Sequence, residues 1–345
     1  MIAYRAAVGI CTLCFLLACG LASAQEVSDA NPNQTIRINV SKTDRLASSG
    51  VSGSFKHILA PRQGYGVRSS SKRLVKTASE TTSAAMQAQC ARNIPGVPNP
   101  GFYPADIDDT GGGPVVVEAV GHPIYVNTTP DAVGYPGTLL RDLGKSEMVH
   151  IVDQYVGATH DYRYKAGLGG VVSYSVSGAL QDADVTAIVH AAAVAFGKTG
   201  YKTVYHVFLA PGQDVCSEGT CYSPDDPSNF TFCAYHDSID FTDIGHVIYT
   251  LEPFQAVDGC SEGPSSPNGL VVDSTMSTLS HEFFESITDP DGNAWWNRLS
   301  FDLNGDEIAD TCVIANFDPV AKLNGKLYEL QAEYSNKYHA CSYTP

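Results

Sequence analysis

The chain has 345 residues and a formal net charge of −16, from 37 Asp and Glu against 21 Lys and Arg. This acidic balance argues against nucleic acid as a partner and suits divalent cations or cationic solutes. A chain of this length can bury a large core, in one large domain or two.

The first 24 residues have the pattern of an export signal. Arg5 precedes an apolar run at residues 6–21, and Ala22-Ser23-Ala24 is a small-residue cleavage site. The run of about 16 residues is shorter than the ~20 that a membrane-spanning helix needs, so we expect no membrane span. Leu16-Leu17-Ala18-Cys19 resembles a bacterial lipobox, which makes a lipid anchor at Cys19, at the cell envelope, the alternative to secretion.

Residues 25–95 differ from the rest of the chain. They contain ten Lys and Arg against four Asp and Glu, are rich in Ser and Thr, and lack a sustained apolar period. We therefore expect a basic, low-complexity, flexible leader at 25–95 and one mixed α/β domain at 96–345.

Short β-branched or aromatic runs bounded by turn residues predict six strands in that domain. They are Pro114–Val120, His122–Val126, Gly169–Val176, Lys202–Ala210, Phe230–His236 and Gly245–Leu251. Between the third and fourth strands, residues 182–197 predict a helix that is capped by Asp182 or Asp184 and stopped by Gly197. Apolar side chains on nearly all its faces predict that it lies buried behind the sheet.

Seven cysteines follow the signal, and in an exported chain they indicate disulfides. They are Cys90, Cys216, Cys221, Cys233, Cys260, Cys312 and Cys341. Proximity suggests Cys216 with Cys221, the chain end suggests Cys312 with Cys341, and the isolated Cys90 is the expected free thiol.

The most informative segment is Ser280-His281-Glu282-Phe283-Phe284-Glu285, which lies in a predicted helix from Ser274 to Ile287 that is capped by Asp273 or Ser274 and stops before Pro290. It matches the zinc-hydrolase pattern HExxH except that a glutamate replaces the second histidine. His281 and Glu285, four positions apart, project side by side and can reach one cation. Glu282 is turned about 100° away, where that pattern places the general base.

A third ligand is expected from the acid-rich residues downstream. Asp291 is one choice, and Glu307 is favoured because Cys312 would hold its segment, with Asp310 orienting His281 or completing the site. The zinc-hydrolase pattern makes zinc the first choice of cation. One imidazole with carboxylates is a harder ligand set than a histidine-rich one, however, which makes manganese or calcium more competitive. The spacing Asp302-x-Asn304-x-Asp306 also resembles the start of a calcium loop, but the glutamate of a complete loop is replaced by Val313.

The remaining histidines have less specific settings. His190 is predicted to pack in the core, and His206 and His246 lie inside predicted strands. His236, at a strand end beside Cys233, is better placed to face a site.

Several segments together resemble the EXORDIUM, or phosphate-induced, protein family in its microbial secreted form. They are residues 280–285 with Thr288-Asp289-Pro290, Asn293-Ala294-Trp295-Trp296, residues 307–312, Phe232-Cys233-Ala234-Tyr235-His236, Asn324-Gly325, residues 331–336 and Cys341. The resemblance spans residues 115–341 and implies an extracellular protein with a zincin-like α/β domain, without a settled activity.

We therefore expect an exported metal-binding protein and, if it is an enzyme, a metal-dependent peptidase or hydrolase with Glu282 as base. The alternative is a non-catalytic extracellular interaction protein in which the motif is structural. Its expected partner is an extracellular peptide or protein, or a cell-surface component.

Overall fold

The computed structural model describes residues 31–47, 57–60, 95–97, 106–109, 111–262, 266–297, 307–313 and 320–345. The expected export signal, Cys19, Cys90 and the acidic loop at 302–306 lie outside these residues. Among the helices within these ranges, none combines the length and apolar character needed to cross a membrane.

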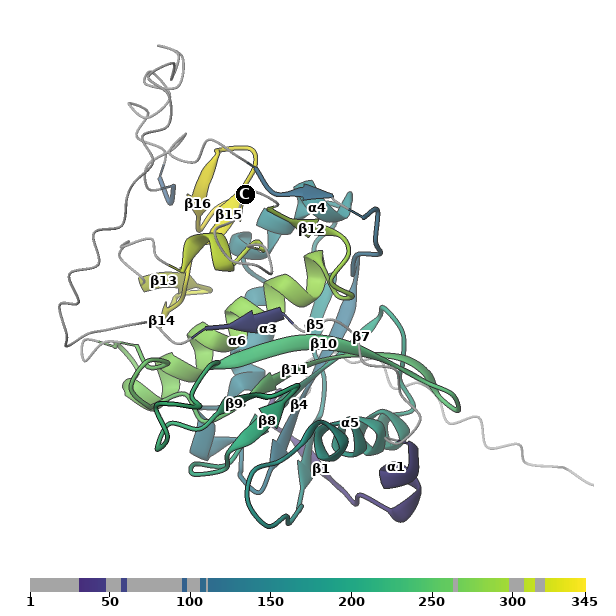
Figure 1. Ribbon diagram of the computed structural model, residues 1–345. Helices are drawn as coiled ribbons and strands as arrows, with labels where there is room; N and C mark the ends of the chain where they lie inside the picture. The colour runs from purple at the N-terminus through teal and green to yellow at the C-terminus, as the bar shows by residue number, and fades with distance from the viewer. Residues whose placement is uncertain are drawn as a thin grey trace, which may run out of the picture.

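A mixed eight-stranded sheet forms the centre of the molecule, in the order β1-β6-β4-β7-β11-β10-β2, with β5 paired to β4 (Figure 1). The strands are β1 (Thr35–Ile38), β2 (His57–Leu59), β4 (Ala119–Val126), β5 (Tyr164–Ala166), β6 (Gly169–Val172), β7 (Thr203–Leu209), β10 (Ala234–Phe241) and β11 (Gly245–Glu252). Pairing is parallel from β1 through β11, while β10 is antiparallel to both of its neighbours. The mixed α/β prediction is confirmed at this level.

The predicted strands are recovered with different ends. β7 and β11 match closely, whereas Pro114–Val120 and His122–Val126 are replaced by the single strand β4, which continues through Gly121 and Pro123 in register with β7. The expected strand at Phe230–His236 begins only at Ala234, because Phe230 makes an isolated bridge with Cys221 instead.

Helices cover both faces of the sheet (Figure 1). One face packs on α5 (Asp182–Phe196), and the other packs on α6 (Leu270–Thr288) together with α3 (Pro136–Gly144) and the short helices η3 (Glu147–Val152) and α4 (Asp153–Val156). Side chains alternate along β7, so Tyr205 and Val207 join the α5 core while Val204 and Phe208 join the α6 core.

The buried helix α5 agrees with its prediction except at the first residue. Gln181, rather than Asp182 or Asp184, is the N-cap, and Asp184 accepts a hydrogen bond from its backbone N–H at 3.0 Å in a capping box. Gly197 ends the helix at φ 61°, a conformation that favours glycine.

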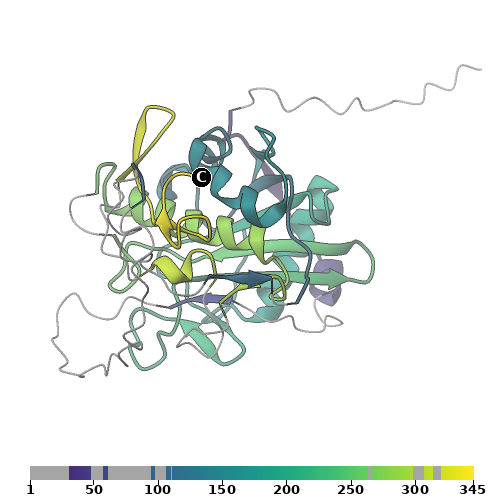
Figure 2. The same ribbon diagram turned by 90° about the horizontal axis from the view of Figure 1, so that it is seen from above.

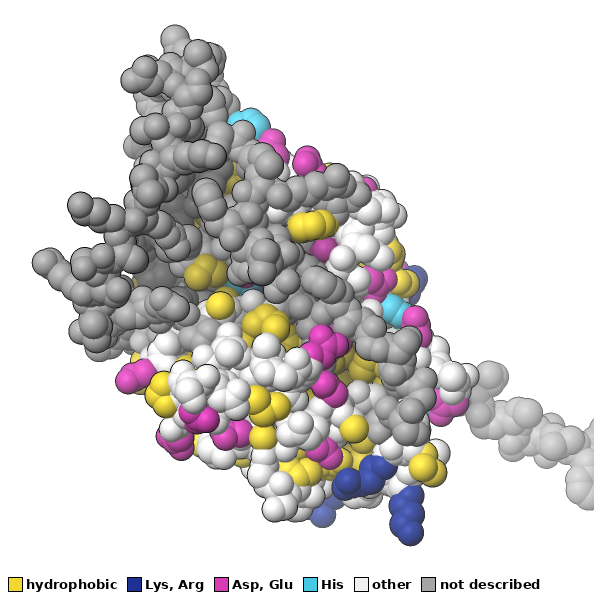
Figure 3. Space-filling model, in the orientation of Figure 1, with side chains coloured by type: hydrophobic (Ala, Val, Ile, Leu, Met, Phe, Trp, Pro, Cys, Tyr) yellow, Lys and Arg dark blue, Asp and Glu magenta, His cyan; other side chains and the backbone are white. Residues whose placement is uncertain are grey.

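The N-terminal region differs from the flexible leader expected at 25–95. β1 and β2 are strands of the central sheet, and α1 (Lys42–Ala47) packs on α5, where Asp44 lies 2.6 Å from His190. Lys and Arg side chains gather near α1 on the face seen in Figure 3. The composition of this region does not reveal these short elements, because their stability comes from the sheet and the helix that they join.

Small hairpins flank the main sheet: β8 (Val215–Ser217) with β9 (Thr220–Tyr222), β13 (Val320–Leu323) with β14 (Lys326–Glu329), β15 (Glu333–Ser335) with β16 (Ala340–Ser342), and the ladder of β3 (Asp108–Asp109) with β12 (Trp295–Trp296). Two further short helices are η2 (Asp131–Val133) and η4 (Asp310–Cys312). Figures 1 and 2 both place the C-terminal segment beside α6, and β14 contacts that helix.

Three disulfides tie these peripheral segments down. Cys216–Cys221 and Cys312–Cys341 confirm the two expected pairs. Cys233–Cys260, which the sequence left open, fastens the start of β10 to the segment before α6.

Candidate metal centre

Helix α6 carries the motif and is longer than expected. It begins at Leu270, with Gly269 at its N-cap at φ 94°, so Asp273 and Ser274 lie inside the first turns. Asp273 instead accepts a hydrogen bond from the backbone N–H of Asn268 at 2.6 Å. The end at Thr288 agrees with the predicted stop before Pro290.

Both faces of α6 are buried. Its apolar side, including Leu279, Phe283 and Ile287, packs in the hydrophobic core. Its polar side, with His281, Glu282 and Glu285, is no more than 1% exposed and does not form the solvated face of a surface helix. Burying charged groups is unfavourable unless other groups or ions compensate them, so this side of α6 requires an explanation.

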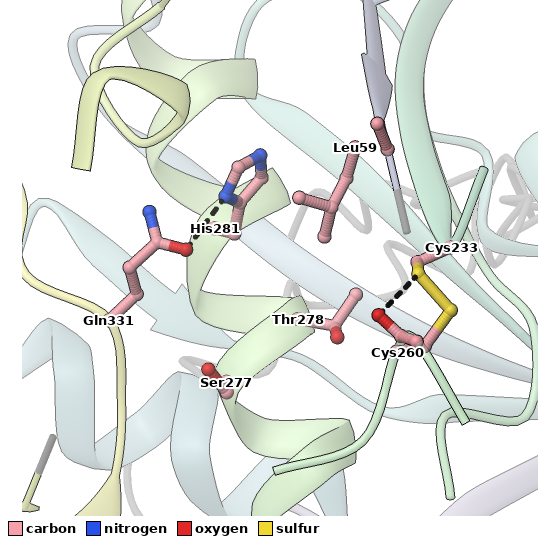
Figure 4. A pocket seen from close by; sticks show the side chains of 9 residues that line it. Leu59, Cys233, Cys260, Ser277, Thr278, His281 and Gln331 are labelled. Atoms are coloured by element: carbon pink, nitrogen blue, oxygen red, sulfur yellow. Dashed lines mark hydrogen bonds between the residues drawn. A yellow bond between two sulfur atoms is a disulfide. The ribbon is translucent and has the colours of Figure 1, made fainter. Parts of the chain in front are cut away.

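The first ligand group comprises His281, Glu285 and Asp310, whose ligand atoms lie within 4.8 Å of one another. His281 Nε2 lies 3.1 Å from Glu285 Oε1 and 3.4 Å from Asp310 Oδ1. On its other side, His281 Nδ1 lies 3.3 Å from Gln331 Oε1 (Figure 4). The Gln331 amide donates to the carbonyl of Ala309. Gln331 Oε1 is thus an acceptor, so His281 donates to it from Nδ1, and Nε2 is the ring nitrogen that faces the carboxylates.

The second ligand group comprises His236, Glu282 and Glu285. His236 Nδ1 lies 3.5 Å from Glu282 Oε2 and 3.5 Å from Glu285 Oε2. His236 Nε2 donates to the backbone carbonyl of Asp289 at 3.1 Å, and Glu307 Oε2 lies 3.6 Å from the same nitrogen. A carbonyl can only accept, so Nε2 carries a proton, and Nδ1 is the ring nitrogen that faces the two glutamates.

Carboxylates outnumber imidazoles around this centre. Buried Glu252 interacts electrostatically with Glu282, and buried Glu333 with His281 and Glu285. Burial raises the pKa of Glu252, Glu307 and Glu333 well above the ordinary value, and burial raises that of Glu282 to about 7. Even two imidazolium ions would not neutralise this group, so protons or bound cations must supply the remaining positive charge.

The pKa values of the two histidines also reflect the excess of carboxylates over imidazoles. Burial lowers the pKa of His281, but Glu285 and Asp310 outweigh it and hold the pKa well above its ordinary value. For His236 burial is likewise outweighed, by Glu307, Glu282 and Glu285. Each imidazole is therefore in a field that strongly favours a positive charge at the centre.

Five of the sequence-predicted site residues are brought together: His281, Glu282, Glu285, Glu307 and Asp310. Asp291 is not. The carboxylate of Asp289 accepts hydrogen bonds from the N–H groups of Asn293 and Ala294, both at 2.7 Å, and so shapes the turn after α6. Asp291 then pairs with His246 at 3.2 Å and accepts from Tyr201 at 2.6 Å.

Sequence reasoning missed Glu252, Glu333 and Gln331, and it ranked His236 below the motif residues. Glu252 ends β11, and Glu333 begins β15. The one local signal was an ionisable residue at the end of an otherwise apolar strand. The packing predicted for His190 is confirmed, since it is buried between Asp44 and Asp243, at 2.6 and 3.0 Å.

A small cavity of about 10 Å³ lies beside His281, lined also by Ser277, Thr278, Gln331 and the Cys233–Cys260 disulfide (Figure 4). Its volume is that of about one water molecule. Asp310, whose side chain is 19% exposed, is the member of the first ligand group nearest to solvent.

The residues present fit a divalent cation. Glu282 is fully buried, and neither of its carboxylate oxygens has a hydrogen-bond partner among the described residues. Histidine nitrogen with carboxylate oxygen suits zinc or manganese, and the abundance of carboxylates extends the fit to calcium. Comparisons of the chain with protein-family models, with curated proteins and with solved structures found no match.

Proposed function

We propose that this chain is an exported metal-binding protein that holds a divalent cation, with zinc expected first, between His281, Glu285 and Asp310. The observation that carries the proposal is the orientation of His281. Its Nδ1 is committed to Gln331, and its Nε2 lies 3.1 Å from Glu285 Oε1. This outer hydrogen bond to a metal-ligating imidazole is the usual arrangement in metalloproteins, because it fixes the ring and its tautomer.

Export is supported by the N-terminal signal pattern and by the three disulfides, which persist in oxidising compartments. The resemblance to the EXORDIUM family points to the same location. An extracellular peptide or protein, or a cell-surface component, is the partner that this location implies.

Hydrolysis is a second candidate function, and Glu282 supports it. Its pKa is raised by burial to about 7, a value that suits a general base near neutral pH. A bound zinc ion would supply Lewis acidity to a carbonyl group or water. The alternative is a non-catalytic interaction protein, and in its favour the pocket beside His281 has room for only about one water molecule.

The test is the metal content and thermal stability of the purified full chain with and without a chelator. We expect chelation to lower the melting temperature of the wild type, because a cation that binds only the folded state stabilises it. His281→Ala should lose both the metal and the chelator effect, while His339→Ala, at a histidine outside the centre, should keep them. Equal metal content in wild type and His281→Ala would contradict the proposal.

Glu282→Gln separates the two candidate functions. If the protein is a peptidase, this variant loses turnover while keeping its fold. If the centre is purely structural, the variant changes the free energy of unfolding and has no effect on what the protein does in the cell.

A further inference from the structure

The two ligand groups share one residue, Glu285. Each group approaches a different oxygen atom of its carboxylate. Oε1 is 3.1 Å from His281 Nε2 and accepts a hydrogen bond from the Asp310 backbone N–H at 3.2 Å. Oε2 is 3.5 Å from His236 Nδ1. The carboxylate therefore lies between two sets of ligands that come from different parts of the fold.

We propose that Glu285 bridges two divalent cations, one held with His281 and Asp310 and the other with His236 and Glu282. This inference rests on the metal-binding function proposed above and adds a second site to it. A syn carboxylate that offers one oxygen to each of two metals is the arrangement used by carboxylate-bridged binuclear centres.

The second site has its own supporting observations. His236 donates from Nε2 to the Asp289 carbonyl, so Nδ1 is the ring nitrogen that faces the cluster, as Nε2 is in His281. Glu282 is 0% exposed, and its Oε2 lies 3.5 Å from His236 Nδ1. A fully buried carboxylate beside an imidazole needs positive charge next to it, which a cation held by both groups would supply.

The charge of the centre also fits two cations better than one. Glu282, Glu285, Glu307 and Asp310 all lie close to the two imidazoles, and Glu252 and Glu333 interact electrostatically with the same group. One divalent cation leaves a surplus of buried negative charge, whereas two divalent cations balance the four nearest carboxylates.

The ligands come from separate elements, which makes the two sites individually testable. His236 lies on β10, Glu282 and Glu285 on α6, and Asp310 in η4, the short helix that the Cys312–Cys341 disulfide holds. Replacing His236 removes a ligand from the second site only, and replacing His281 removes one from the first site only.

The experiment is a titration of metal-free, disulfide-intact full chain with Zn²⁺, and separately with Mn²⁺, followed by calorimetry and elemental analysis. The wild type should bind two ions per chain, His236→Ala and His281→Ala one each, and Glu285→Gln should bind both ions at least tenfold more weakly. Circular dichroism of each metal-free variant checks its fold. For a variant that does not fold, the wild-type stoichiometry decides the question alone.

Two bound Mn²⁺ ions that share a carboxylate should also give an exchange-coupled electron paramagnetic resonance spectrum, which is lost in His236→Ala. One ion per chain in the wild type, with His236→Ala unchanged, would overturn the bridged pair and leave the proposed single site intact. No bound ion in the wild type would overturn both.

Discussion

At the scale of single residues, the centre depends on hydrogen bonds that sit behind the candidate ligands. Gln331 orients His281, and the Asp289 carbonyl orients His236. Such outer contacts set which nitrogen carries the proton, so their loss weakens metal binding without removing a ligand. The sequence pattern identified the ligand helix but gave no sign of these partners, because they lie more than 40 residues away along the chain.

Asp289 is expected to be a key residue for the turn after α6. It is fully buried, and its carboxylate accepts from the N–H groups of Asn293 and Ala294. Asp289→Ala leaves both donors unsatisfied and should lower the free energy of unfolding by about 2–4 kcal/mol, measured by urea denaturation. Asp289→Asn keeps one acceptor oxygen and should recover part of that loss; equal stability of all three proteins would contradict this role.

His246 should make stability depend on pH above neutrality. Burial lowers its pKa, but hydrogen bonds and charge interactions with Asp291 and Asp240 outweigh this and raise the pKa above the ordinary 6.5. A raised folded-state pKa means that the contribution is complete below about pH 6.5 and is lost as the pH rises through the folded value.

We expect the difference in unfolding free energy between wild type and His246→Gln to be largest near about pH 6 and to shrink toward about pH 9. Denaturation curves across this range measure it, with His160→Gln, at an exposed histidine, as the control. A difference that stays constant over the range would show that the ion pair with Asp291 contributes nothing.

At the scale of elements, the helices and strands with a periodic apolar pattern were predictable. The convergence of the candidate ligands on one centre was not. The apolar runs of β7 and β11 and the alanine-rich α5 are marked by local patterns, which is why their positions agree. On α6 the polar and apolar side chains lie on separate faces, but the polar face is buried as well. Periodicity distinguishes the faces of a helix without showing which one meets solvent.

The Cys312–Cys341 disulfide should matter to the centre, because it holds the segment that contains Glu307 and Asp310. It closes a loop with a sequence separation of 29, for which chain entropy gives a stabilisation of about 3–4 kcal/mol. Replacing both cysteines with serine should lower the melting temperature and weaken Zn²⁺ binding at least tenfold, as measured by calorimetry.

The matched control is the double serine variant of Cys216 and Cys221, whose sequence separation is 5 and whose hairpin is not part of either ligand group. It should keep the wild-type affinity for Zn²⁺. Equal affinity in both double variants would show that the C-terminal disulfide does not position the ligands.

At the scale of the whole molecule, the centre lies where three parts of the chain meet: the sheet at β10, helix α6, and the C-terminal region in which η4 contacts β15. The sequence predicted a mixed α/β domain and placed the motif helix near its end, both of which agree. It did not predict that β1, α1 and β2 belong to that domain, because each is too short to have a pattern of its own. Glu252 and Glu333 reach the centre only through sheet pairing and the C-terminal fold.

The N-terminal elements should therefore contribute to stability. β1 extends the sheet beside β6, and Asp44 of α1 contacts His190 of the buried helix α5. A chain that begins at residue 48 should melt at a lower temperature than one that begins at residue 31, since it exposes apolar surface and leaves His190 without Asp44. Differential scanning calorimetry makes the comparison, and equal melting temperatures would mean that this segment is dispensable.

The central claim is that the buried histidines and carboxylates around α6 hold divalent cations. Elemental analysis of the full chain, purified without chelators and compared with His281→Ala, tests it most directly. We predict stoichiometric zinc or manganese in the wild type and a loss of at least one ion per chain in the variant. The claim would be contradicted if a folded wild-type protein held no stoichiometric metal even after incubation with Zn²⁺ and Mn²⁺. Protons would then supply the positive charge that the buried carboxylates require.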